Sequence, residues 1–384
     1  MGSGYSLILL RQGTEFNEQR KFFKMSLGAH TVGSYDGLIQ QSIRSFMSEV
    51  DGYAGDPYPR LMKSIGAVVT TIAYGEHVYS EHGDTLVQLN TERTQLVAWV
   101  FTKFWFVNIL PFLRYTPSWF PGAYFQQVAK RGLFLANRVR FWPLEIIKNA
   151  MADGTADESL VYKHITEAVF TENTTRDSTS VMYSAGVDTT ATALCNLFFA
   201  LVLFPEWQVK LQNELDEVVG QGHLPTAQDI AKLRLFEAVW KESLRWHPPV
   251  PLGIPHVNTD ADVYKGYYIP KGSVIHCNIG CMLRDPRVWG EDSEEFNPSR
   301  FLPEINPQAK SLPDIGNIPF GFGRRICPGR FLAERIGRQL ATAVLSTYTL
   351  VPVEGEVVTP SMPFEDSTIR RPTDFKCHFK PRSD

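Results

Sequence analysis

The sequence has few cysteines and no C-x-x-C pair. Its five cysteines all lie in the second half of the chain: Cys195, Cys277, Cys281, Cys327 and Cys377. An odd number without close pairs is unlike a disulfide framework or a zinc knuckle. This pattern indicates a polypeptide that folds in a reducing compartment.

Long apolar runs and an excess of basic charge are also missing. No apolar run reaches the roughly 18 residues that a membrane span needs. The apolar patch 5–10 has no basic segment before it, so we expect neither a membrane anchor nor a cleavable signal in this chain. Its 38 Lys and Arg against 41 Asp and Glu give a net charge of −3, which argues against nucleic acid as a partner and favours small-molecule chemistry.

Aromatic side chains, in contrast, are abundant. They are densest in the segment 101–125, FTKFWFVNILPFLRYTPSWFPGAYF, which three prolines interrupt. Two interpretations are open for this segment. It forms either a core helix followed by a buried loop, or a surface that touches a membrane or a substrate.

The apolar periodicity predicts one mainly α-helical domain over 1–384 with a minor β portion. Helices are expected over 20–50, 61–72, 84–109, 125–151, 206–220, 229–246 and 330–348. The stretch 178–204 predicts one long central helix that ends at Pro205. A hairpin is expected in 262–278, a loop-rich region over 284–328, and short strands in 351–379.

The strongest chemical signal is the stretch FGFGRRICPG at 320–329, directly ahead of the last predicted helix. Its three glycines let the backbone approach a flat ligand closely. A cysteine at a helix N-terminus gains thiolate character, because free N–H groups and the helix dipole favour negative charge there. Such a thiolate can bind iron and push electron density toward bound dioxygen, which favours cleavage of the O–O bond.

This stretch resembles the haem-binding loop of cytochromes P450, F-x-x-G-x-R-x-C-x-G, at every defined position. The resemblance implies that Cys327 is the axial ligand of the haem iron, with Phe320 and Gly329 beside it. It also implies that Arg325 pairs with a haem propionate. The other four cysteines lack these surroundings, and we expect them to be small core residues.

The pair Glu242 and Arg245 is similar to a second motif of that family, E-x-x-R. The two residues share a helix face because they are three positions apart, and alone they would be interpreted as a surface ion pair. The stretch FNPSRF, which contains Arg300, resembles the third partner segment. The match implies a buried charge network that fixes the loop leading to Cys327.

On the predicted central helix, the stretch AGVDTT resembles the family's oxygen-activation motif, A-G-x-D/E-T-T. Gly186, beside Ala185, leaves room for a ligand, and the hydroxyl of Thr189 can take a backbone carbonyl's hydrogen bond and open the helix locally. Asp188 and Thr189 beside a water chain can deliver the two protons that dioxygen activation needs. Without the cysteine loop, this stretch would be interpreted as an N-cap or a solvated helix face.

Two further residues are similar to propionate contacts of the family. The stretch FNEQR stands where the family usually has W-x-x-x-R. Arg20 matches this pattern, whereas Phe16 departs from it. The missing indole N–H predicts haem retention weaker by about 0.5–1.5 kcal/mol. His256 resembles a contact of many microsomal members, and the alternative is a histidine satisfied within its loop.

The similarity runs from about residue 20 onward in the family's motif order and is nearest to fungal microsomal members. The chain is therefore expected to have the cytochrome P450 fold without its N-terminal helix and first strands, and without a membrane anchor. The resemblance implies haem b, dioxygen, an apolar substrate and electrons from NADPH through a cytochrome P450 reductase. It also implies a place on the cytoplasmic side of the endoplasmic reticulum. Arg324 and Arg330 are expected to help dock an acidic reductase surface.

Three hypotheses for function follow. The first is a monooxygenase that inserts one oxygen atom into an apolar substrate, and Asp188 with Thr189 favours it. The second is an enzyme of the same fold that rearranges or dehydrates an oxygenated substrate and needs no proton relay. The third is a truncated, non-catalytic remnant or incomplete gene model that binds haem weakly or not at all.

Overall fold

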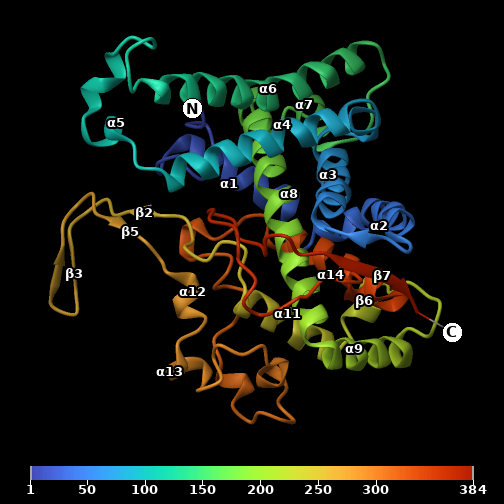
Figure 1. Cartoon of the computed structure of the whole chain (residues 1–384). Coiled ribbons are helices and arrows are strands. Elements are labelled where there is room, and N and C mark those ends of the chain that lie inside the picture. Colours follow the sequence, from blue (N-terminus) through green and yellow to red (C-terminus); the bar gives the residue numbers. More distant parts are fainter. Residues whose placement is uncertain (1, 383–384) are drawn as a thin grey trace.

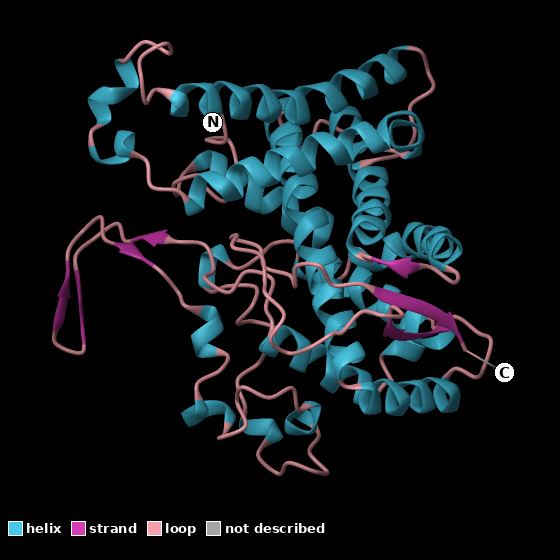
Figure 2. Ribbon diagram, in the orientation of Figure 1, coloured by secondary structure: helices cyan, strands magenta, loops and turns pink. Residues whose placement is uncertain are grey.

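Long helices make up most of this computed structural model, which describes residues 2–382 (Figures 1 and 2). The long and middle-sized helices are α1 (Thr14–Leu27), α2 (Asp36–Val50), α3 (Tyr58–Tyr74), α4 (Glu76–Thr102), α6 (Tyr124–Ala152), α7 (Leu160–Thr166), α8 (Glu172–Leu203), α9 (Pro205–Val218), α11 (Arg234–Trp246) and α14 (Arg330–Thr347). Single-turn helices are α5 (Phe106–Ile109), α10 (Ala227–Ile230), α12 (Ile279–Met282) and α13 (Pro286–Trp289). Short 3₁₀ helices are η1 (Val32–Tyr35), η2 (Pro111–Tyr115), η3 (Pro298–Phe301), η4 (Ala309–Ser311) and η5 (Gly323–Arg325). The prediction of a mainly α-helical fold is confirmed.

Helix α8 runs through the middle of the molecule (Figure 1) and contacts α1, α3, α11 and α14 among others. Its C-terminal part, 191–203, is apolar on nearly all sides, as expected for a helix enclosed by other elements. By length and composition it is the one helix within residues 2–382 that could cross a membrane, but 78% of its apolar window is buried inside the protein. It starts earlier than predicted because the hydroxyl of Thr171 accepts a hydrogen bond from the amide of Thr174 at 3.1 Å and caps the helix.

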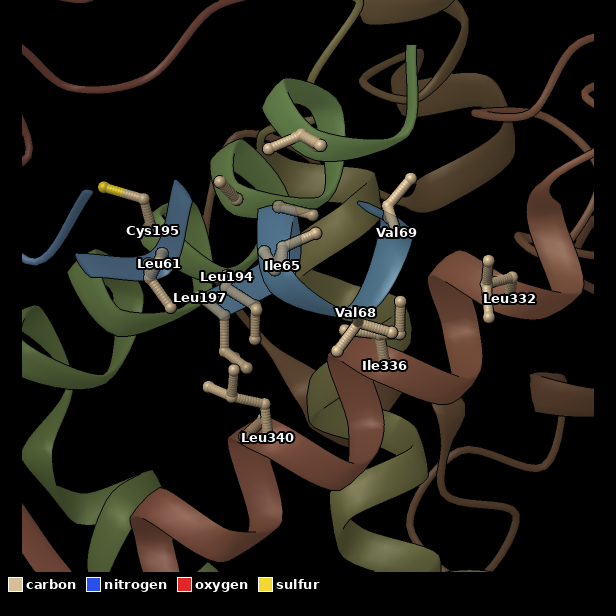
Figure 3. Close-up of a cluster of buried hydrophobic side chains, with 14 of the residues drawn as sticks. Leu61, Ile65, Val68, Val69, Leu194, Cys195, Leu197, Leu332, Ile336 and Leu340 are labelled. Atoms are coloured by element: carbon tan, nitrogen blue, oxygen red, sulfur yellow. The ribbon is translucent and has the colours of Figure 1, made fainter. Parts of the chain in front are cut away.

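The core that supports the loop 320–329 lies where α3, α8 and α14 meet (Figure 3). Buried side chains from all three helices interdigitate there: Leu61, Ile65, Val68 and Val69 of α3, Leu194, Cys195 and Leu197 of α8, and Leu332, Ile336 and Leu340 of α14. Close packing of this kind resists displacement of any one helix. The core therefore fixes the start of α14, and the loop ahead of it, relative to α8.

The strands are short and form three separate sheets. One sheet has the order β1 (Ala54–Gly55), β7 (Cys377–Pro381), β6 (Tyr348–Pro352), and all its pairings are antiparallel. The predicted hairpin is present as β3 (Asp262–Tyr264) paired with β4 (Tyr267–Ile269). The following strand β5 (Val274–Ile275) pairs instead with β2 (His256–Val257). The hairpin projects from the helical body (Figure 2).

Three of the predicted helical stretches are divided. The stretch 229–246 forms the end of α10 and then α11. The stretch 20–50 forms α1 and α2, with a turn that begins at Gly28. A Cβ at this position would lie 2.5 Å from the carbonyl oxygen of Lys24, so the turn fits only a glycine. The stretch 84–109 forms α4, which ends at Thr102, and then α5.

The aromatic segment 101–125 is exposed rather than buried. Phe104, Phe106, Phe112 and Trp119 have between 63 and 79% of their surface accessible. The interpretation of this segment as a core helix with a buried loop is therefore wrong, and the surface interpretation remains.

The other four cysteines differ in their surroundings. Cys195 and Cys377 are fully buried, as predicted for small core residues, and Cys277 is partly buried. Cys281 lies on the surface, so the prediction is wrong for this residue. No disulfide forms among the described residues.

Candidate functional site

The loop 320–329 closes on itself just before α14. The amide of Cys327 donates a hydrogen bond to the carbonyl oxygen of Phe320 at 2.7 Å. Gly321 and Gly323 have φ angles of +81° and +57°, and no atom lies within 4 Å of the place where either would carry a Cβ. Gly329 is the N-cap of α14, and a Cβ there would lie 4.0 Å from the sulfur of Cys327. The loop thus leaves open space where a flat group can approach the backbone.

The charge state of Cys327 reflects opposing influences. Burial is the largest and raises the pKa of the thiol. The amides of Gly329 and Arg330, together with the guanidinium groups of Arg20 and Arg330, act in the opposite direction. The net direction is upward, so the expected lowering of the pKa is wrong for the polypeptide alone. The sequence reveals the field of the helix N-terminus but not the cost of burying an anionic sulfur. A coordinated metal cation would offset that cost.

Two arginines converge on this loop without a carboxylate partner among residues 2–382. Arg20 of α1 donates from Nη1 to the carbonyl oxygen of Ile326 at 2.7 Å. Arg325 donates from Nη2 to the carbonyl oxygen of Leu10 at 2.7 Å, and its guanidinium carbon lies 4.5 Å from the centre of the buried Phe16 ring. Two positive charges beside an open loop favour an anionic group nearby. They fit the haem propionates that the resemblance to the P450 motifs implied.

Helix α8 opens to a cavity or to solvent at only one place along its core. From 175 to 202 its residues are buried, except for Ser184, Ala185, Gly186, Asp188 and Thr189. We call these five residues the α8 window. All of them except Ser184 lie in the AGVDTT stretch that the sequence singled out.

Within the α8 window, the hydroxyl of Thr189 donates to the carbonyl oxygen of Ala185 at 2.7 Å. The helix continues through this point without a break, so the expected local opening is absent. A Cβ at Gly186 would have one neighbour within 4 Å, a methyl carbon of Val69 at 3.8 Å. Packing of the polypeptide therefore does not require glycine there, which favours a ligand as the reason for it.

The carboxylate of Asp188 points to the start of α3, where the hydroxyl of Tyr58 donates a hydrogen bond to it. Burial raises the pKa of Asp188, and the hydrogen bond from Tyr58 and the nearby Arg371 lower it in part. The guanidinium of Arg371 lies 3.9 Å from the centre of the Tyr58 ring and forms ion pairs with Glu365 at 3.0 Å and Asp56 at 3.7 Å. These partners are distant from Asp188 in the chain and match no motif, so they could not be predicted from the sequence.

Glu242, Arg245 and Arg300 form one buried network. The carboxylate of Glu242 accepts hydrogen bonds from Arg245 at 2.7 and 2.9 Å and from Arg300 at 3.1 Å. Arg300 also pairs with Asp292 at 3.1 Å, a fourth member that the sequence did not suggest. Arg245 donates as well to the carbonyl oxygens of Leu283, Ser293 and Glu295. The network ties α11 to the loops that lead toward Cys327.

His256 lies at the start of β2 and pairs through its backbone with Ile275. Its ring makes no hydrogen bond within the described part of the chain, so it is not the satisfied loop histidine of the alternative interpretation. A contact of His256 with a propionate stays a prediction.

The donor set at the loop suits a metal that brings its own ligands. Among residues 2–382, no group of three or more His, Cys, Asp or Glu side chains is arranged to hold a metal ion. Cys327 thus offers one sulfur ligand, and a porphyrin would bring the other ligands of the metal with it. The open glycine loop, the single sulfur, the two guanidinium groups without carboxylate partners and the α8 window are the features expected of a haem-thiolate type of site.

Comparison with known proteins agrees with this class. The family model described as Cytochrome P450 matches residues 2–379. The chain is 33% identical over 400 residues to "Cytochrome P450 monooxygenase claR" of Ampulloclitocybe clavipes, which covers 100% of this chain and 72% of the relative. It is 34% identical over 391 residues to "Cytochrome P450 monooxygenase 208" of Postia placenta, with coverage of 100% and 75%. The chain belongs to the cytochrome P450 family, whose monooxygenases are oxidoreductases.

Solved structures support the fold. A zebra fish cytochrome P450 with progesterone superposes with a TM-score of 0.79 at 22% identity, covering 98% of this chain and 85% of that one. A zebra fish cytochrome P450 structure with abiraterone gives a TM-score of 0.77 at 22% identity. The predicted cytochrome P450 fold is confirmed.

Proposed function

We propose that this chain is a haem-thiolate monooxygenase that acts on an apolar small molecule. One atom of dioxygen enters the substrate as a hydroxyl group, and the other leaves as water. Two electrons come from NADPH through a cytochrome P450 reductase, and two protons come from solvent. The observation that carries this proposal is the loop around Cys327, with its open glycine side and its two guanidinium groups without carboxylate partners.

The residues present would hold haem b as follows. Cys327 would be the iron ligand, with Phe320 and Gly329 shaping the loop around it. Arg20, Arg325 and His256 would bind the propionates. Ala185 and Gly186 of α8 would leave room for the group. When bound, the haem supplies the redox chemistry that activates dioxygen.

Asp188 and Thr189 would manage the protons. Because burial raises the pKa of Asp188, its carboxyl group can carry a proton nearer to neutral pH than an exposed aspartate can. The hydroxyl of Thr189 lies on the same window of α8 and is anchored by the carbonyl of Ala185. A rearranging enzyme that uses no dioxygen has no need of this pair, so its presence favours the oxygenase.

Partner and location follow from family resemblance and from the surface. Arg324 is exposed beside the loop, and Arg330 is partly exposed at the start of α14, where cations can steer an acidic reductase. We propose a place on the cytoplasmic face of the endoplasmic reticulum, with the exposed aromatic segment 101–125 against the lipid.

A spectrum tests the proposal. The purified chain is reduced, treated with carbon monoxide and compared with Cys327→Ser and with the control Cys281→Ser. The expected result is a strongly red-shifted Soret band in the unchanged chain and in the control, and its loss in Cys327→Ser. Absence of haem uptake by the unchanged chain would instead support the non-catalytic remnant. The chain spans about three quarters of the length of the relatives it matches.

Catalysis needs a second measurement. With reductase, NADPH and a substrate, the oxygenase incorporates one labelled oxygen atom from ¹⁸O₂ into the product. Product that forms without NADPH and without label would favour the rearranging enzyme.

A further inference from the structure

An arginine and an asparagine on α4 are buried without adequate partners. Arg93 is 9% exposed. Its Nη1 donates to the hydroxyl of Ser184 at 2.7 Å, and its Nε has no hydrogen-bond partner. Asn90, one turn earlier, is 1% exposed, and neither its Oδ1 nor its Nδ2 has a partner. Residues three apart on a helix share a face, so these unpaired polar groups lie together.

Arg93 differs in this respect from every other buried arginine among residues 2–382. Arg176 pairs with Asp177 at 2.8 Å, Arg245 pairs with Glu242 at 2.7 Å, and Arg300 pairs with both Glu242 and Asp292. Burying a guanidinium group without a counter-charge is costly. The fold therefore provides a carboxylate partner for each of these three arginines but not for Arg93.

The position of Arg93 relates it to the candidate reaction site. Its hydrogen-bond partner Ser184 is the first residue of the α8 window, and the hydroxyl of Ser184 is itself anchored to the carbonyl of Ser180 at 2.6 Å. Thr189 follows five residues later, which corresponds to about 7.5 Å along the helix axis. The guanidinium group therefore stands at one end of the window, and the candidate proton-delivering residues stand at the other.

We propose that Arg93 and Asn90 bind a carboxylate of the substrate, which makes the substrate an apolar molecule with one acidic group. The guanidinium supplies a positive charge and free N–H donors, and the Asn90 amide supplies a further donor. One positive charge and one amide match a monoanion better than a doubly charged phosphate. The separation along α8 places the oxidised carbon several bonds away from the carboxylate. This inference rests on the proposed function for the identity of the site.

Ligand binding without turnover tests the inference. The probes are dodecanoate and abietate, each compared with its neutral primary amide, and the readout is calorimetric titration of the purified chain. We expect at least one carboxylate to bind at least about tenfold more tightly than its amide. The reason is that charge-assisted hydrogen bonds are stronger than hydrogen bonds between neutral groups. Arg93→Met should abolish this preference, whereas Arg234→Met, which removes an exposed arginine, should leave it unchanged.

Stability provides an independent readout. If only a bound ligand compensates the charge of Arg93, then Arg93→Met removes an uncompensated buried charge from the ligand-free chain. Its thermal midpoint should then rise or stay unchanged. A structural arginine would instead lower the midpoint when replaced. Equal binding of both carboxylates and their amides, or a preference that survives in Arg93→Met, overturns the inference.

The outcomes also separate this inference from the proposed function. A chain that keeps an Arg93-dependent preference for carboxylates but gives no thiolate spectrum refutes the monooxygenase and not the carboxylate site. A chain with the thiolate spectrum but without the preference refutes only the carboxylate site.

Discussion

The hydroxyl of Tyr58 controls the carboxyl group that we propose as a proton donor. Its hydrogen bond lowers the pKa of Asp188 against the effect of burial. Tyr58→Phe removes that bond, so the pKa of Asp188 rises further and the carboxyl group releases its proton less readily. We expect a several-fold larger fraction of NADPH electrons to appear as hydrogen peroxide rather than product.

The measurement is peroxide and product per NADPH consumed, with reductase present. Tyr162→Phe on α7 is the control, because the ring of Tyr162 lies outside this cluster. The Tyr58→Phe variant should keep the carbon monoxide spectrum of the unchanged chain. An unaltered peroxide fraction would show that Tyr58 has no part in proton delivery.

His247 makes the stability of the fold depend on pH. Its ring stacks on Phe364 with a centroid distance of 4.2 Å, and its Nδ1 lies 3.3 Å from the guanidinium of Arg284. Burial and this neighbouring charge lower the pKa of His247 from 6.5 to about 3. Between these two pH values the unfolded chain binds a proton that the folded chain does not, so the free energy of unfolding falls as the pH falls.

Urea midpoints at pH 7.5 and pH 5 check this expectation. His247→Gln should narrow the difference between the two midpoints, and His223→Gln, at an exposed histidine, should leave it unchanged. Part of the difference should remain in His247→Gln, because burial also lowers the pKa of His164. A difference of the same size in His247→Gln would assign the acid sensitivity to other groups.

The charge network beneath α11 connects a regular helix to an irregular region. Glu242 and Arg245 are completely buried, so their hydrogen bonds are not replaced by water when one partner is lost. Glu242→Gln leaves Arg245 without its counter-charge and should lower the free energy of unfolding by about 3–5 kcal/mol. Denaturant unfolding followed by circular dichroism measures the loss.

A surface ion pair gives the matched control. Asp285 pairs with Arg287, whose side chain is 87% exposed. Asp285→Asn should lower the free energy of unfolding far less than Glu242→Gln does, because water replaces the interaction. Equal losses for the two variants would mean that the buried network contributes no more than a surface pair.

The helices were predictable where the sequence pattern itself carries the cause. The apolar character of 193–204, with Pro205 after it, predicts the enclosed end of α8, and the structure has both. The start of α8 was predicted too late, because the hydroxyl of Thr171 caps a first turn made of polar residues. The division at Gly28 was missed, since a close approach to the carbonyl of Lys24 is a contact that periodicity does not report.

In the candidate site, too, some residues could be predicted from local motifs and others could not. Cys327, Asp188 and Thr189 belong to contiguous motifs, so they could be singled out from the sequence alone. Tyr58 is 130 positions from the carboxylate it contacts, and no local pattern connects the two. Arg93 lies in a stretch of α4 that resembles a solvated helix face, and its burial results from packing against α8 and the helices around it.

The whole molecule consists of a packed helical body and an exposed aromatic segment, 101–125, that projects from it. The segment 101–125 links α4 to α6 and carries Phe104, Phe106, Phe112 and Trp119 on its surface, at one corner of the molecule (Figure 1). An exposed apolar patch of this size costs free energy in water. Contact with a lipid surface removes that cost, and aromatic rings suit the interface between headgroups and acyl chains.

Flotation with liposomes tests this contact. The unchanged chain should float with phosphatidylcholine and phosphatidylserine vesicles, and the double variant Phe112→Ser with Trp119→Ser should bind at least tenfold less. The control is Tyr267→Ser with Tyr268→Ser, which removes two exposed aromatic rings from the β3–β4 hairpin. Equal losses in both variants would mean that exposed aromatic area alone governs adsorption. A loss confined to the first variant makes 101–125 the membrane-facing side, and the hydrophobic substrate would then reach the α8 window from the lipid rather than from water.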